Sequence, residues 1–410
     1  MKFLPLLFTV FIDTLGFGLV MPMLGPLILE ASAMMSSEIS QEMRGWSYSL
    51  LIAFFCLGQF FGSPILGAIS DRIGRKKIIV STIILALFSY LIGIFSLLKA
   101  NIFLFFLSRL LAGVAAGNYP IAQSYIADET KEEDKVKNFG LLGMSWGLGF
   151  ILGPWIGGKC SVFFGSGNTS WTGPFILAGS LCVINLSMVV IFVRESVFAP
   201  NRKKISFFAG CQDLVKAFTH PNLKKIFLVM FLFCFGWGFF NEFTPIFLMD
   251  RLSFHVEDIG NFFACVGLWV AICQGYLIRP FAKRFSSQNL MMFSFLIFSI
   301  LLAILCFIKN SFQLYFLLPF LAFFESAIYP SAASLISNIS SKENQGEVLG
   351  VYNSVQWAAI GLSPFFSGSL IIKFPFLSPA IASFCMLLAF SVFLRYKHTI
   401  KKEILFERSS

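Results

Sequence analysis

The sequence predicts an all-α integral membrane protein, in which twelve transmembrane helices form two six-helix bundles related by a pseudo-twofold axis. Three observations lead to this fold class: the composition, the spacing of the apolar runs and an internal repeat. Of the 410 residues, 57% are hydrophobic and 13% are charged, and the mean hydropathy is +0.80. Soluble domains carry about 25% charged residues, so water cannot be the main solvent of this chain.

Apolar runs of about 20 residues, the length that crosses a bilayer as a helix, recur along the whole chain. The first run has only Lys2 before it and is longer than the apolar part of a signal peptide, so we interpret it as the first span. Breaks in hydropathy place the spans at 4–29, 45–69, 78–98, 101–127, 137–159, 174–193, 226–249, 257–282, 289–308, 311–337, 346–372 and 377–394.

Most of the 31 Lys and Arg residues fall in alternate connections and in the tails. The positive-inside rule therefore places both termini in the cytoplasm, which requires an even number of spans. This distribution also accounts for the net charge of +10 without a nucleic-acid partner. We expect a multi-pass protein of the plasma membrane, which in a bacterium is the inner membrane.

The longest cytoplasmic connection, residues 195–225, is basic and divides the chain into two sets of six spans. We predict an N-terminal bundle over 1–194 and a C-terminal bundle with a short tail over 226–410. Apolar residues at helical spacing between Phe207 and Phe218 fit a short helix on the inner membrane surface, and a plain tether is the alternative.

The two halves repeat each other under a shift of 210 residues, the distance from Pro120 to Pro330. The shift superimposes Tyr119 on Tyr329, Ala122 on Ala332, Ser124 on Ser334, Ile126 on Ile336, Gly140 on Gly350, Pro154 on Pro364 and Gly158 on Gly368. Because six spans separate the copies, the repeat has parallel topology, and a cavity is expected between the halves.

A basic loop follows the second span, where residues 62–77 read GSPILGAISDRIGRKK. This stretch resembles the signature loop of the major facilitator superfamily, a fold of twelve helices in two bundles. The resemblance implies a cytoplasmic gate that holds the outward-facing state, with Gly67 for close packing, Asp71 as the acid, and Arg72 and Arg75 as its partners. The alternative is that these cations only set topology.

By this resemblance we expect Asp71 to lie against the N-terminus of span eleven, near Glu347, where a negative charge is favoured. The second-half copy of the loop has Lys283 where the acid would stand. A symmetric second gate is therefore not expected.

Span four reads RLLAGVAAGN from Arg109 to Asn118. It is similar to the RxxxG element of the superfamily, in which the arginine is linked to proton coupling. An arginine inside a span costs several kcal/mol unless it finds an acid, carbonyls or water, so Arg109 must face the protein interior. A structural arginine bonded to the backbone of a neighbouring span is the alternative.

Span five is rich in glycine, with Gly149, Gly153-Pro154 and Gly157-Gly158 in register. It resembles the GxxxGPxxGG motif that marks antiporters of the superfamily, particularly the twelve-span drug/proton group that includes the tetracycline exporters. A glycine face permits close helix packing. The alternative is packing that carries no information on the direction of transport.

Three acids lie deep in spans: Asp13 in span one, Glu242 in span seven and Glu325 in span ten. Asp13 matches the acid in span one of the tetracycline-type exporters. A buried carboxyl group exposed alternately to two aqueous sides can load and release a proton. We therefore predict proton coupling through these acids and Arg109, and for each acid the alternative is a structural ion pair or hydrogen-bond partner.

Polar and aromatic residues in the spans are candidates for the lining of a substrate cavity. They are Gln59, Asn118, Tyr119, Gln123, Trp146, Asn241, Tyr329, Asn353, Gln356 and Trp357. The aromatic ones can equally serve packing or anchor the chain at the membrane interface.

Several function classes find no support in the sequence. The nine Cys are scattered singly and the three His lie in or beside connections, so neither a metal site nor a disulfide framework is predicted. No HExxH or Walker motif indicates an enzyme, and no cofactor is expected.

The residues and the resemblance together predict a proton-coupled secondary active transporter that works by alternating access and exports a small amphipathic molecule or drug. We expect a monomer whose partners are the small-molecule substrate, protons and the lipid bilayer. Two alternatives remain open: a metabolite or siderophore carrier of the same superfamily, and a non-transporting membrane sensor.

Overall fold

All regular elements in the described part of the chain are helices. The computed structural model describes residues 4–29, 34–36, 38–129, 132–163, 171–195, 209–220, 223–339, 345–367 and 370–407. By their internal contacts, these residues group into unit 1 (Met1–Ala209, Ser253–Gly267 and Gly368–Lys373) and unit 2 (Gly210–Leu252, Leu268–Ser367 and Phe374–Ser410). The division into bundles at residues 195–225 stays a prediction.

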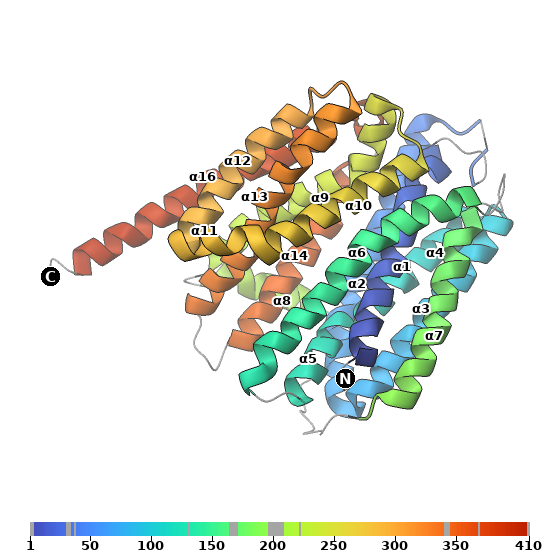
Figure 1. The fold of residues 1–410 in the computed structure, drawn as a ribbon, viewed down its shortest axis with the longest axis horizontal. Coiled ribbons are helices and arrows are strands. Elements are labelled where there is room, and N and C mark those ends of the chain that lie inside the picture. The colour runs from blue at the N-terminus through green and yellow to red at the C-terminus, as the bar shows by residue number, and fades with distance from the viewer. Residues whose placement is uncertain are drawn as a thin grey trace. The chain divides into compact units, whose positions relative to one another are not determined.

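The helices of the first part of the chain belong to unit 1. They are α1 Leu4–Leu29, α2 Gln41–Ile73, α3 Arg75–Leu98, α4 Ile102–Ala116, α5 Tyr119–Glu129, α6 Glu132–Phe163 and α7 Gly173–Phe192. In this unit α1 packs on α6 and α7, α2 on α4, and α3 on α4 and α7 (Figure 1). The short helix α15, Leu370–Lys373, and the first part of α10, Val256–Ile272, are also in unit 1.

Unit 2 holds most of the remaining helices. They are α8 Ala209–Thr219, α9 Lys224–Leu252, the π-helix η2 Cys273–Leu277, α11 Ile278–Arg284, α12 Ser287–Leu305, α13 Ser311–Ile339, α14 Gln345–Ser367 and α16 Leu377–Glu407. Here α9 packs on α14 and α16, and α12 packs on α13 and α16. The helix predicted around 207–218 is present as α8, and its place on the membrane surface stays a prediction.

Eleven helical segments of the described residues are long and apolar enough to cross a membrane. Helix α14, with 23 residues, lies where a further span was predicted at 346–372. The prediction of an all-helical membrane protein is confirmed.

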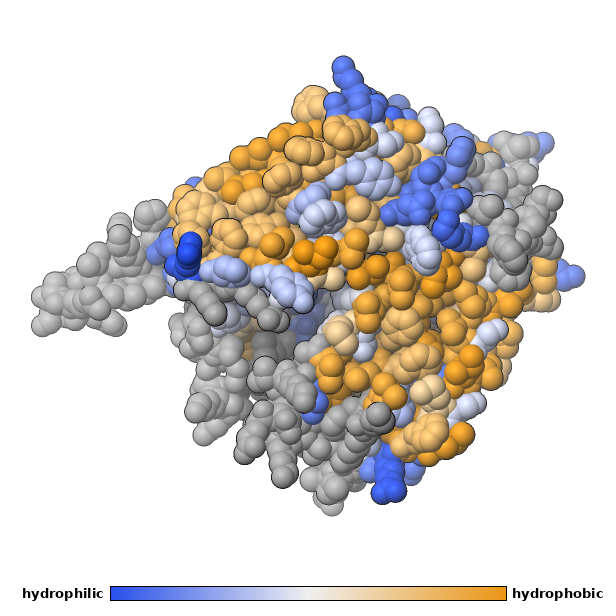
Figure 2. All heavy atoms as spheres, in the orientation of Figure 1, coloured by the Kyte–Doolittle hydropathy of each residue, from blue (hydrophilic) through white to orange (hydrophobic). Residues whose placement is uncertain are grey.

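Large apolar side chains cover the outside of the helices. Phe103 and Phe312 are each 79% exposed, and Phe307 is 76% exposed. In unit 2, Figure 2 shows apolar side chains spread over the face formed by α12 and α13. A soluble protein rarely exposes apolar patches of this extent, whereas lipid tails solvate them.

Small residues let neighbouring helices of unit 1 approach closely. A Cβ atom added at Gly113 of α4 would lie 2.0 Å from the carbonyl oxygen of Phe55 in α2, and one added at Gly58 would lie 2.3 Å from the carbonyl oxygen of Leu110. Only glycine fits at these contacts, because a Cβ atom would clash with the neighbouring backbone. Such close packing stabilises helix pairs in a bilayer, where the hydrophobic effect between helices is absent.

Arg44 of α2 closes the end of α1. Arg44 is 5% exposed, and its guanidinium donates hydrogen bonds to the carbonyl oxygens of Ile28 at 2.9 Å, Ser36 at 3.0 Å and Met35 at 3.3 Å. The last carbonyls of a helix have no partner within the helix. The buried charge of Arg44 therefore has a structural role.

Two predicted spans contain breaks in their backbone. The span predicted at 101–127 is divided into α4 and α5 by a turn at Gly117 and Asn118, just before Pro120. Proline lacks an amide hydrogen and is favoured in the first turn of a helix, which suits a helix that begins at Tyr119. Its counterpart in the repeat, Pro330, lies inside α13, so proline alone does not cause the break.

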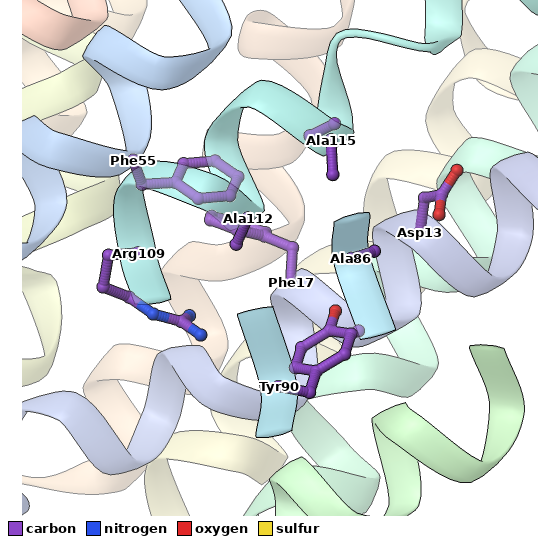
Figure 3. Close-up of a pocket in the computed structure, with 10 residues that line it drawn as sticks. Asp13, Phe17, Phe55, Ala86, Tyr90, Arg109, Ala112 and Ala115 are labelled. Atoms are coloured by element: carbon purple, nitrogen blue, oxygen red, sulfur yellow. The ribbon is translucent and has the colours of Figure 1, made fainter. Parts of the chain in front are cut away.

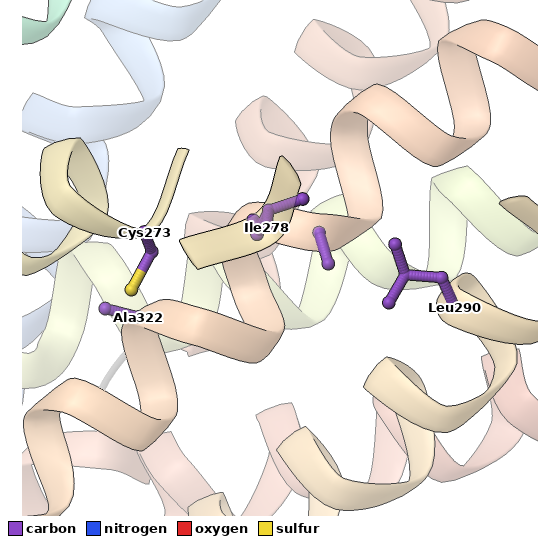
Figure 4. Close-up of a cluster of buried hydrophobic side chains, with 5 residues drawn as sticks. Cys273, Ile278, Leu290 and Ala322 are labelled. Atoms are coloured by element: carbon purple, nitrogen blue, oxygen red, sulfur yellow. The ribbon is translucent and has the colours of Figure 1, made fainter. Parts of the chain in front are cut away.

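The span predicted at 257–282 contains the π-helix η2. Cys273, its first residue, is fully buried in a cluster with Ala322 and Ala327 of α13, Ile278 of α11 and Leu290 of α12 (Figure 4). Single π-turns inside α-helices occur frequently at functional sites. This one packs against the stretch of α13 that carries Glu325.

Candidate functional site

Asp13 lies in the middle of α1 and is half-buried. Its carboxylate accepts a hydrogen bond of 2.6 Å from the side-chain amide of Asn118. Asn118 stands in the turn between α4 and α5, so the break before Pro120 presents this amide to α1. The structure thus joins an acid and a polar residue that the sequence predicts separately.

Arg109 of α4 is buried, with 4% of its surface exposed. Its guanidinium carbon lies 5.1 Å from the ring centre of Phe175 and 5.6 Å from that of Phe105, and one amino group is 3.4 Å from the Ser108 hydroxyl. Its Nε atom has no hydrogen-bond partner in the structure. Arg109 faces the protein interior, as predicted, and its guanidinium packs against aromatic rings. Among the described residues, it forms no hydrogen bond to a backbone carbonyl.

Asp13 and Arg109 line the same small cavity, together with Tyr90 of α3 (Figure 3). The volume of the cavity is about 20 Å³. The remaining lining is apolar or small: Gly16, Phe17, Phe55, Ala86, Ala112, Ala115 and Ala116. The acid and the arginine of the predicted coupling machinery are therefore neighbours across one cavity.

Tyr90 is a site residue that the sequence does not reveal. It is 6% exposed, and its hydroxyl lies against α1 at Gly16, where an added Cβ atom would be 2.2 Å from the hydroxyl oxygen. A tyrosine in an apolar run is typical of packing and does not by itself indicate a functional site. The only signal in the sequence is Gly16, whose missing side chain leaves room for a neighbour.

Glu325 of α13 lies in unit 2 and is half-buried. Its carboxylate accepts a hydrogen bond of 3.0 Å from the indole nitrogen of Trp237 in α9. One turn further along both helices, the Tyr329 hydroxyl lies 3.8 Å from the Cys234 sulfur. Glu325 and Tyr329 are four residues apart, so they lie on one face of α13, and both contact α9.

Glu242 of α9 is 7% exposed, and its neighbour Asn241 is 6% exposed. The Asn241 side-chain amide donates a hydrogen bond of 3.3 Å to the Glu242 carboxylate. This acid is therefore more enclosed than Asp13 or Glu325. Its part in proton coupling stays a prediction.

The basic loop after α2 forms an ion pair of its own. Arg75 lies 2.5 Å from the Asp71 carboxylate and donates a hydrogen bond of 2.8 Å to the Ser70 hydroxyl. Arg72 is exposed, and a Cβ atom added at Gly67 would meet nothing within 4 Å. The side chain of Glu347, near which Asp71 was expected, lies outside the described residues.

Gly74 fixes the turn between α2 and α3. Its φ of 112° is rarely adopted by residues with a side chain, and a Cβ atom there would lie 2.6 Å from the Glu195 carboxylate. Glu195 accepts a hydrogen bond of 3.0 Å from the backbone amide of Lys76 in the first turn of α3. The sequence does not reveal this acid, which suits the positive end of a helix.

Three glycines of span five form a row along α6, four residues apart, that packs on the backbone of α1. Cβ atoms added at Gly149, Gly153 and Gly157 would lie 2.6 Å, 2.7 Å and 2.2 Å from the carbonyl oxygens of Phe11, Leu15 and Leu19. Pro154 faces α1 as well, since a Cβ atom on Gly18 would be 2.6 Å from its ring.

Gly158 faces another helix of unit 1. A Cβ atom there would lie 2.9 Å from the carbonyl oxygen of Val256 in α10. The adjacent Lys159 forms an ion pair of 2.6 Å with Glu257. The predicted close packing of the glycine motif thus has two partners, α1 and the start of α10.

The remaining cavity candidates are distributed over both units. Gln59 is 7% exposed, and its side-chain oxygen has no partner among the described residues. Tyr119 and Gln123 are half-buried, and Trp146 stacks on Phe150 with ring centres 5.4 Å apart. Asn353 is exposed, while Gln356 and Trp357 are half-buried. Substrate binding by these residues stays a prediction. Within the described residues, no group of three His, Cys, Asp or Glu side chains is arranged to hold a metal ion.

Two relatives of known name resemble this chain over most of its length. The tetracycline resistance protein, class B, of Escherichia coli is 27% identical over 357 residues, which are 86% of this chain and 84% of that protein. The quinolone resistance protein NorA of Staphylococcus aureus (strain Mu50 / ATCC 700699) is 29% identical over 372 residues, which are 89% of this chain and 88% of NorA.

Solved structures share the fold. The crystal structure of the POT family transporter PepTSo matches with a TM-score of 0.77 at 12% identity and covers 98% of each chain. This likeness confirms the predicted fold class. The family model of the Major Facilitator Superfamily matches residues 6–286 and 226–409. Because these ranges take in nearly the whole sequence, the chain belongs to the Major Facilitator Superfamily.

Proposed function

We propose that this protein is a proton-coupled secondary transporter that exports small amphipathic molecules in exchange for protons. The observation that carries the proposal is the cavity shared by Asp13 and Arg109. Asp13 is half-buried and accepts a hydrogen bond from a neutral amide, and no Lys or Arg of the described residues forms an ion pair with it. A carboxyl group in this position is able to bind and release a proton during a transport cycle.

The relatives support export and the substrate class. One is named for resistance to tetracyclines and the other for resistance to quinolones, and both drug classes are amphipathic molecules with fused rings. The glycine row of α6 matches the antiporter motif, and its packing on α1 places that motif against the helix that carries Asp13. Both features favour exchange over uptake.

The transport cycle that we propose is alternating access by two bundles, 1–194 and 226–410, joined by the connection 195–225. Both termini lie in the cytoplasm, the membrane is the plasma membrane, and the protein acts as a monomer. Asp71 serves the cytoplasmic gate, and its ion pair with Arg75 supports this role. Glu325 and Glu242 are further candidates for proton coupling.

The proposal can be tested with purified protein in lipid vesicles that contain a pH-sensitive dye. Addition of tetracycline or a quinolone should release protons from loaded vesicles in proportion to the drug that enters. Protein-free vesicles provide the control for passive drug diffusion. A proton flux that does not change with any drug of a chemically diverse panel would contradict coupled export and favour a sensor.

A further inference from the structure

Arg109 leaves a question that the proposed function does not answer. Its guanidinium is buried, its Nε atom has no hydrogen-bond partner, and no ion pair with an acid is formed in the described part of the chain. The aromatic faces of Phe105 and Phe175 offset only part of the cost of burying a cation. A further polar partner must therefore complete its surroundings.

Tyr90 stands between Arg109 and Asp13. Figure 3 shows its ring between the two, and each is close enough to interact with it electrostatically, as is Cys182 of α7. The hydroxyl oxygen fits over α1 only because Gly16 has no side chain. Since Gly16 follows Asp13 by three residues, the hydroxyl reaches α1 within one helical turn of the carboxylate.

The cavity beside these groups has the size and the polarity of a water site. Its open space of about 20 Å³ exceeds the roughly 10–15 Å³ that one water molecule requires. A buried water also needs two to four polar partners. Arg109, Tyr90 and Asp13 line the cavity, and each carries a polar group that can serve as such a partner.

We propose that this cavity binds water, and that the Tyr90 hydroxyl holds the water which connects Arg109 with Asp13. The guanidinium only donates hydrogen bonds and the ionised carboxylate only accepts them, whereas water and the tyrosine hydroxyl do both. A continuous series of hydrogen bonds therefore joins the cation to the anion. When Asp13 takes a proton from solvent, its carboxyl group becomes a weaker hydrogen-bond acceptor, and this series of hydrogen bonds weakens. Tyr90 is thus a positioning residue: it holds the water through which a change in the charge of Asp13 alters the hydrogen bonding of Arg109.

This inference rests on the proposed role of Asp13, and infrared spectroscopy tests the two separately. Difference spectra between acidic and neutral pH are recorded on the full protein in lipid vesicles without drug. The carboxyl band of Asp13 is identified by its loss in Asp13→Asn, and the arginine and tyrosine bands by isotope labelling. A water band is identified by its shift in H2¹⁸O.

In the wild-type protein we expect the carboxyl, tyrosine, arginine and water bands to change together. Tyr90→Phe keeps the ring and should retain the carboxyl band but lose the arginine and water bands. Ala86→Val fills the cavity and should lose the water and arginine bands with Tyr90 intact. Tyr352→Phe is the matched control, because it removes a buried hydroxyl without a hydrogen-bond partner in unit 2, and it should keep all four bands.

An arginine band that persists unchanged in both Tyr90→Phe and Ala86→Val would overturn the inference and leave the proposed function standing. A wild-type protein with no pH-dependent Asp13 band would contradict the proposed function, and the inference with it. The two failures are therefore distinguishable in one set of spectra.

Discussion

Gly16 shows how a single missing side chain can shape the candidate site. The Tyr90 hydroxyl occupies the place where a Cβ atom would stand. The aromatic ring of Tyr90 is buried against Phe175, with ring centres 6.3 Å apart, so it has little freedom to withdraw. The position of the hydroxyl therefore depends on glycine at this residue.

Gly16→Ala should lower the free energy of unfolding by about 1–3 kcal/mol, the usual cost of overpacking, and should weaken drug-driven proton release. Thermal unfolding in detergent measures the first effect, and the vesicle assay measures the second. Gly143→Ala is the matched control, because nothing lies within 4 Å of its added Cβ atom. Equal stability of the two variants would show that Tyr90 does not depend on Gly16.

Glu325 offers a second residue-scale prediction. Glu325→Gln removes the charge but leaves an oxygen that can accept the hydrogen bond from Trp237, so folding should be preserved. We expect transport of a cationic drug to fall about tenfold or more while the melting temperature stays within a few degrees. Trp237→Phe, which removes the donor and keeps the charge, provides the comparison.

A different result for Glu325→Gln would point to a structural role. If expression and stability collapse while the residual protein keeps the wild-type affinity and pH dependence, Glu325 is a structural partner of α9. In that case its functional interpretation fails.

At the scale of elements, the contact between α1 and α6 joins the antiporter motif to the helix of Asp13. The glycines of the row are four residues apart, so they lie on one face of α6, and each meets a backbone carbonyl of α1. Because the contact is between two backbones, no side-chain rearrangement can relieve it, and a helix can change the contact only by moving as a whole. Movements of α6 should therefore be transmitted to α1.

Gly153→Ala should force α1 and α6 apart, since its Cβ atom would lie 2.7 Å from the Leu15 carbonyl oxygen and 2.9 Å from the Cα atom of Gly18. We expect a loss of about 1–3 kcal/mol in the free energy of unfolding. Gly147→Ala is the control on the same helix, because nothing lies within 4 Å of that position, and it should be neutral or gain helix propensity of up to about 1 kcal/mol. Opposite or equal shifts in melting temperature would contradict the packing account.

At the scale of the whole molecule, the sequence predicts the span positions well but not the breaks within spans. Hydropathy places the first span at 4–29, where the structure has α1. Hydropathy does not predict the turn at Gly117 or the π-helix at Cys273–Leu277. A hydropathy window averages over about 19 residues, and hydropathy contains no information on backbone hydrogen bonds.

The site was predictable as a set of charges but not as an arrangement. A charge inside a span is a functional hypothesis from sequence alone, and Asp13, Arg109 and Glu325 were found in this way. Tyr90, Glu195 and the capping role of Arg44 depend on contacts between residues far apart in the chain. No local pattern encodes such contacts.

The central claim is that Asp13 couples drug export to protons. It is tested most directly with Asp13→Asn in vesicles, by measuring drug accumulation driven by a pH gradient beside drug exchange at equal pH. The account predicts that the variant, folded and inserted, loses accumulation against a gradient while exchange at equal pH continues. Accumulation at the wild-type level in Asp13→Asn would contradict the account and place the coupling site at another residue.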